Sequence, residues 1–172
     1  MQSHGRELAT GQLRLRPANV NDAAGIRAVH EAAFGRADEA NLVKALQDSG
    51  SIRISLVAMQ SKDIVGHILF SKMEAPFPAL GLGPVAVLPR EQRRGIGSKL
   101  ILEGLQRAMK EGWKGVFVVG EPRFYERFGF SIRQASGFGC TYSGPFFMVK
   151  ALSELPTSTG SVEYAAAFRE FE

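Results

Sequence analysis

A short segment in the middle of the chain combines residue types that bind phosphate groups. It reads Gln92-Arg93-Arg94-Gly95-Ile96-Gly97-Ser98 and leads into a run with helical periodicity. The first N–H groups of a helix have no partner within the helix, and glycine lets a ligand approach the backbone closely. Such helix ends bind phosphate through these N–H donors and the helix dipole, and arginines add positive charge. The segment therefore predicts a site for a phosphate-bearing ligand.

The positive charge of the chain is concentrated around this segment. The net charge is +4, and residues 88–114 hold seven basic and three acidic side chains. A local positive field indicates an anionic partner at one place, whereas a solvated helix face rich in lysine and arginine would explain the charge equally well. Trp113 is the only aromatic residue of this window. Nucleic-acid binding through stacked bases is therefore not expected.

Two well-known phosphate loops do not fit the segment. A Walker A loop needs Gly-Lys-Ser/Thr, but this chain has Gly97-Ser98-Lys99. A dinucleotide-binding fingerprint needs a third glycine where this chain has Leu100. The pattern present is Gln-x-x-Gly-x-Gly after an apolar strand that ends in Val87-Leu88-Pro89. A second pattern, Tyr-x-x-x-Gly-Phe, follows at residues 125–130.

These two motifs, in this order, resemble those of the GCN5-related N-acetyltransferase (GNAT) superfamily. Its coenzyme A motif is Arg/Gln-x-x-Gly-x-Gly/Ala, and its companion motif is Tyr-x-x-x-Gly-Phe. The run 118–130, Ala33-Phe34-Gly35 followed by Glu39, and the stretch 160–164 resemble the YhbS-like branch of predicted acetyltransferases. The resemblance extends from about Leu13 to Phe168.

The resemblance implies an enzyme that moves an acetyl group from acetyl-CoA directly to a primary amine, without a covalent intermediate or a metal. The pantetheine arm would pair with the backbone of Val85, Ala86 and Val87, and the Val87 N–H would polarise the thioester carbonyl. Tyr125 would protonate the departing thiolate. The pyrophosphate would lie on the N–H groups of Gln92, Arg93, Arg94, Gly95, Ile96, Gly97 and Ser98.

Other interpretations of the chain remain open. A coenzyme A-binding sensor or scaffold without catalytic activity would keep the same loop, and Tyr125 would then be a core aromatic residue. The chain has Gly120-Glu121-Pro122 where many relatives carry an asparagine, which leaves a side-chain contact to pantetheine in doubt. The general base is unassigned, because the strand before the loop contains no acid and no histidine; the candidates are Glu39, Glu74, Glu121, His67 and water. His67, in an apolar strand, is more typical of a core histidine, and Cys140 of a small buried or loop residue.

The pattern of elements predicts a single α+β domain with a mixed central sheet and helices on both faces. A short flexible segment, 1–12, would precede the domain at 13–172. Strands are expected at 13–16, 55–59, 64–70, 81–88, 116–119 and 146–152. Helices are expected from a cap at Asn21-Asp22 to about Phe34, from a cap at Asp38 to about residue 48, at 96–111 and briefly at 122–128. The 96–111 helix should bury a stripe that includes Met109, the 116–119 strand should be covered on both faces, and the tail after Pro156 should pack back on the body.

Composition indicates the class of protein and where in the cell it is expected. The chain has 172 residues, 45% of them hydrophobic, with 19 glycines and 8 prolines, as expected of a globular chain. Its single cysteine cannot form an internal disulfide, which favours a cytoplasmic location. No apolar run approaches the length of a membrane span. The expected partners are a small-molecule or peptide amine, with no nucleic acid and no membrane, and the expected assembly is a monomer or homodimer.

Overall fold

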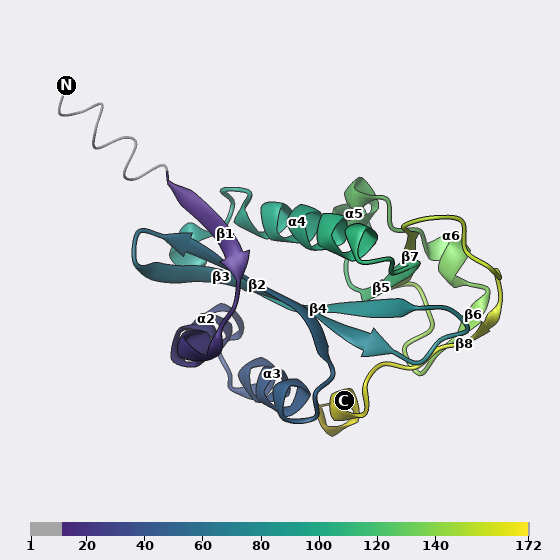
Figure 1. Ribbon diagram of the computed structural model, residues 1–172, viewed down its shortest axis with the longest axis horizontal. Helices are drawn as coiled ribbons and strands as arrows, with labels where there is room; N and C mark the ends of the chain where they lie inside the picture. The colour runs from purple at the N-terminus through teal and green to yellow at the C-terminus, as the bar shows by residue number, and fades with distance from the viewer. Residues whose placement is uncertain (1–11, 172) are drawn as a thin grey trace.

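The computed structural model describes residues 12–171 and is built around one mixed six-stranded sheet (Figure 1). The predicted flexible segment 1–12 lies, apart from Gln12, outside the described residues. The strand order is β1-β2-β3-β4-β5-β7, and all neighbours are antiparallel except β4 and β5. The strands are β1 (Leu13–Pro17), β2 (Ile52–Gln60), β3 (Asp63–Met73), β4 (Ala79–Val87), β5 (Gly115–Val119) and β7 (Phe147–Ala151).

Helices cover both faces of the sheet, as the sequence predicted. Helices α2 (Ala23–Phe34) and α3 (Asp38–Asp48) lie on one face, and α4 (Ile96–Lys110) lies on the other (Figure 1). The C-terminal turn η4 (Ala166–Phe171) packs beside α3. The protein is a single α+β domain. Among the described residues, no helix is long and apolar enough to span a membrane.

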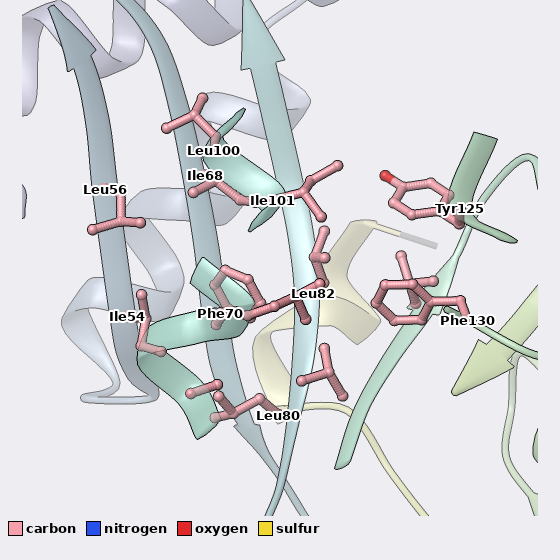
Figure 2. Close-up of a cluster of buried hydrophobic side chains, with 14 of the residues drawn as sticks. Ile54, Leu56, Ile68, Phe70, Leu80, Leu82, Leu100, Ile101, Tyr125 and Phe130 are labelled. Atoms are coloured by element: carbon pink, nitrogen blue, oxygen red, sulfur yellow. The ribbon is translucent and has the colours of Figure 1, made fainter. Parts of the chain in front are cut away.

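Helix α4 shows how the apolar pattern places an element on the sheet. Ile96, Leu100, Ile101, Leu105 and Ala108 are buried in the main core. Figure 2 shows Leu100 and Ile101 within this cluster. The prediction that Met109 belongs to this stripe is wrong, because Met109 is 55% exposed. Ala108 occupies the inward position, and the next residue lies about 100° further around the helix. A Cβ atom on Gly104 would overlap the Phe70 ring, so glycine allows the helix to approach the sheet closely.

Several element boundaries differ from those predicted. The β2–β3 hairpin extends further than the two apolar runs, and its turn is only Ser61-Lys62, with Ser61 at a φ of 56°. Asp38 is the first residue of α3 and not its cap, which is Ala37. Val119 is 44% exposed, so the end of β5 is not covered on both faces. The tail packs back as expected, since Val162 and Tyr164 are buried.

Several short elements were not predicted. Among them are the helix α6 (Ile132–Ala135) and the two-residue strands β6 (Phe138–Gly139) and β8 (Gly160–Ser161), and these two strands pair with each other. The short helices α5 (Pro122–Tyr125) and η3 (Glu126–Phe128) lie where the sequence predicted one helical turn. Two- to four-residue elements carry too little periodicity to be recognised in a sequence.

The sheet opens between its two parallel strands. β4 pairs with β5 only at Ala79–Gly81 against Gly115–Phe117. Beyond Gly81, β4 stays paired with β3 but not with β5. The second half of β4 therefore presents one backbone edge without a strand partner among the described residues.

Candidate active site

Two cavities meet at the open edge of β4. The first, here called the loop cavity, has a volume of about 550 Å³ and lies between β4, the segment that leads into α4, and α5. The second, here called the aromatic cavity, has a volume of about 410 Å³ and lies between β4, α3 and the C-terminal segment. Val85 lines both cavities. A ligand that fills the loop cavity can therefore present its end to the aromatic cavity.

The backbone of β4 turns hydrogen-bonding groups toward the opening. Leu88 donates its N–H to Val65 of β3, at 2.9 Å, and alternate residues of an antiparallel strand face the same neighbour. Ala86 therefore faces β3, whereas the N–H and C=O groups of Val85 and Val87 face the open edge. The Val87 carbonyl already accepts a hydrogen bond from the Gln92 side chain, at 2.9 Å. The Val85 and Val87 N–H groups can donate to a ligand.

The predicted phosphate segment lines the loop cavity and is shaped by two left-handed residues. Gly95 caps α4 with a φ of 82°, and Arg93 has a φ of 66°, which is uncommon for a residue with a side chain. A Cβ atom would meet nothing within 4 Å at Gly95 and only Val87, at 3.8 Å, at Gly97. The first N–H groups of α4 are thus accessible, as an anion site requires. Of the predicted segment, only Arg94 does not line this cavity.

The structure adds a cation that the sequence did not single out. Arg127 lines the loop cavity, donates a hydrogen bond to the Ser98 hydroxyl at 3.3 Å and stacks on Phe124, 4.7 Å from the ring centre. Arg94 instead pairs with Glu91 at 3.2 Å, which partly neutralises its charge. The sequence offered one signal for this role of Arg127: it lies inside the Tyr-x-x-x-Gly-Phe motif, next to several aromatic residues.

Tyr125 lies beside the point where the two cavities meet. It lines the aromatic cavity, and its ring packs edge to face against Phe124 and Phe130 at 5.0 and 5.7 Å. Figure 2 shows the ring extending toward β4 with its hydroxyl at the far end. Burial raises the pKa of Tyr125 to about 12, so the hydroxyl remains protonated and can donate a hydrogen bond at neutral pH. Tyr125 is therefore both a core residue, through its ring, and a residue of the candidate active site.

Glu39 is the one candidate base that lines either cavity. It lies in the wall of the aromatic cavity, and both of its oxygens accept hydrogen bonds from Arg36. The Arg36 guanidinium holds the pKa of the Glu39 carboxyl below its usual value. Glu39 is therefore an anion at neutral pH, better suited to attract a cation than to take a proton from one.

The other candidate residues lie elsewhere. Glu74 and Glu121 are exposed and line neither cavity. His67 is a satisfied core histidine, as expected: Nδ1 contacts His30 Nε2 at 2.8 Å, and Nε2 contacts the Ser55 hydroxyl at 2.8 Å. Cys140 is a half-buried loop residue whose thiol pKa is raised by burial.

Comparisons with known proteins agree with the motifs. A sequence model of the acetyltransferase (GNAT) family matches residues 24–130. The uncharacterized N-acetyltransferase YjhQ of Escherichia coli K12 is 35% identical over 160 residues, which cover 84% of this chain and 88% of YjhQ. YhbS of the same strain, also named an uncharacterized N-acetyltransferase, is 32% identical over 87% of this chain and 95% of YhbS.

Two solved structures extend this similarity to the fold. The crystal structure of E. coli YhbS in complex with CoA superposes with a TM-score of 0.87, at 30% identity, over 94% of each chain. A GNAT family acetyltransferase from Brucella melitensis, in complex with acetyl-CoA, superposes with a TM-score of 0.79, at 36% identity, over 91% of this chain and 98% of that one. With its two motifs at the open edge of β4, the chain belongs to the GNAT family of N-acetyltransferases.

Proposed function

We propose that the protein transfers the acetyl group of acetyl-CoA to a primary amine that enters through the aromatic cavity. The observation that carries this proposal is the open edge of β4, which lies between the accessible N-terminus of α4 and Tyr125. The similar structures from E. coli and Brucella hold CoA and acetyl-CoA, which supports the same co-substrate here.

Each part of the loop cavity suits one part of coenzyme A. The pantetheine arm has amides that can pair with the Val87 N–H and the Val85 carbonyl in the manner of an added strand. The pyrophosphate suits the N–H groups at the start of α4, together with the positive charge of Arg93 and Arg127. The backbone hydrogen-bonding groups of Ala86 face β3, so Ala86 lines the loop cavity without pairing with the arm.

The chemical step follows from where these groups lie. The bound ammonium first loses one proton to water, and the free amine nitrogen attacks the thioester carbonyl carbon. The N–H of Val85, which lines both cavities, stabilises the developing oxyanion in place of Val87, which lines only the loop cavity. The nitrogen loses its second proton to water as the carbon–sulfur bond breaks, and the departing thiolate takes a proton from the Tyr125 hydroxyl, which regains one from water. Glu39 attracts the ammonium form of the amine, and its low pKa leaves water as the better base.

Thiol release from acetyl-CoA, measured with a panel of amines, tests the proposal. We expect release to depend on an amine, and the acetylated amine to appear by mass spectrometry. Coenzyme A binding in calorimetry without thiol release for any amine would contradict the proposal and favour a sensor. Submicromolar binding of duplex DNA at physiological salt would instead show that the basic surface serves a nucleic acid.

A further inference from the structure

The walls of the aromatic cavity are suited to an apolar ring. They carry aromatic side chains from four separate parts of the chain: Phe34, Tyr125, Tyr142, Tyr164, Phe168 and Phe171. Two apolar residues of the same wall are open to solvent, Phe34 at 39% and Val119 at 44% exposure. Apolar surface that gathers around a cavity with few polar groups is typical of a small-molecule site. A bound ligand with an apolar body would remove this surface from water.

In the part of the chain that the structure describes, the charge that lines this cavity is a single carboxylate, and Arg36, which does not line the cavity, already pairs with it and offsets part of its charge. Among the described residues that line it, Glu39 is the only acidic side chain and none is basic. One carboxylate and several aromatic faces favour a ligand with a single positive charge. A polyamine would find only one carboxylate for its several ammonium groups. An acidic substrate would meet Glu39 without a cation in the wall to offset it.

Tyr164 supplies an unused polar atom in the same wall. Its side chain is buried, with 9% exposure, and its hydroxyl has no hydrogen-bond partner among the described residues. The ring is held edge to face between Tyr142 and Phe168, at 5.4 and 5.1 Å. Buried hydroxyls are nearly always hydrogen-bonded, and leaving one unpaired is destabilising. The hydroxyl is closed to water in this conformation, so a ligand oxygen would satisfy this donor only after the neighbouring side chains shift.

We propose that the acceptor is an arylalkyl monoamine with one oxygen on its ring or side chain. Its ammonium group lies near Glu39, its ring lies among the aromatic side chains, and its oxygen accepts a hydrogen bond from Tyr164. This inference rests on the proposed acetyl transfer, because it describes the acceptor of that reaction.

The test compares four amines in the thiol-release assay: tyramine, phenylethylamine, spermidine and a short peptide with a free N-terminus. We expect tyramine to have the highest kcat/KM, with phenylethylamine next. Glu39→Gln should raise KM for both aromatic amines about tenfold, since an ionic hydrogen bond is lost. Glu31→Gln is the matched control, because Glu31 also pairs with an arginine, Arg27, but lines neither cavity.

Tyr164→Phe separates the hydroxyl from the ring. It should reduce the preference for tyramine over phenylethylamine about fivefold and leave phenylethylamine turnover unchanged, as expected for one lost hydrogen bond. A fall for both amines alike would mean that Tyr164 only shapes the wall, and would overturn its assigned contact.

The outcomes distinguish this inference from the proposed function. Preferred acetylation of spermidine or of the peptide would overturn the inference and leave acetyl transfer to amines intact. Titration of tyramine into the coenzyme A complex by calorimetry measures amine binding in the aromatic cavity without turnover. Absence of tyramine binding there would overturn the inference even if other amines are acetylated. Tyramine binding that Glu39→Gln weakens would support the inference even if thiol release with the panel fails.

Discussion

A buried histidine pair between α2 and β3 should make the folded state sensitive to mild acid. His30 and His67 are both fully buried and contact each other at 2.8 Å. Burial lowers the pKa of His30 to about 4 and that of His67 to about 3. The Glu39 carboxylate raises the pKa of His30 and so opposes the effect of burial. At His67, His30 lowers the pKa further, whereas the Asp22 carboxylate raises it. Both histidines are therefore neutral in the folded protein at neutral pH.

The direction and size of the effect follow from these values. In the unfolded chain, each histidine takes up a proton as the pH falls below about 6.5. The folded state does not take up these protons until pH 4 or below, so acid favours unfolding. Each histidine then removes about 1.4 kcal/mol of the free energy of unfolding per pH unit. Between pH 6.5 and pH 5 the pair should remove about 3 kcal/mol, because the unfolded histidines are only half protonated at pH 6.5, and the full stability is present about one pH unit above that value.

Urea unfolding at a series of pH values measures this slope. In His30→Gln, the slope between pH 6.5 and pH 5 should be about half that of the unmodified protein, because only one buried histidine remains. Val29→Ala is the control: it truncates a buried neighbour on the same helix, so it should lower stability equally at every pH. A slope in the unmodified protein no steeper than that of His30→Gln would refute the reasoning.

Three further predictions concern the loop cavity and Tyr125. Gly97→Glu should abolish coenzyme A binding in calorimetry, because a carboxylate would repel the pyrophosphate. The melting temperature should change little, since a Cβ atom fits at this position. Unchanged affinity would contradict the assigned coenzyme A site. Arg127→Ala should weaken binding in the same titration by about 1–3 kcal/mol, and Arg133→Ala, outside the cavity, should not. Tyr125→Phe should lower kcat about 100-fold with little change in coenzyme A affinity, as for loss of a general acid; turnover within about threefold of the unmodified protein would leave Tyr125 as core only.

The sequence was most informative where local chemistry determines local structure. The glycines at 95 and 97 predicted the accessible start of α4, and short apolar and β-branched runs predicted most strands. Which backbone groups of β4 face the opening depends on its pairing with β3 and its separation from β5, and neither is encoded in any short segment. For the same reason, the sequence could not show that Glu39 shares a cavity with Tyr164.

The composition of the aromatic wall has a consequence for how such enzymes diversify. The family model ends at residue 130, whereas Tyr142, Tyr164, Phe168 and Phe171 come after it. Substitutions in this later stretch change one cavity and leave the helix end of the other cavity untouched. These substitutions are restricted at one point, because a side chain at Gly81 would overlap the Tyr164 ring. A relative with a larger residue at position 81 would need a smaller residue at position 164, and the wall of its aromatic cavity would differ in shape.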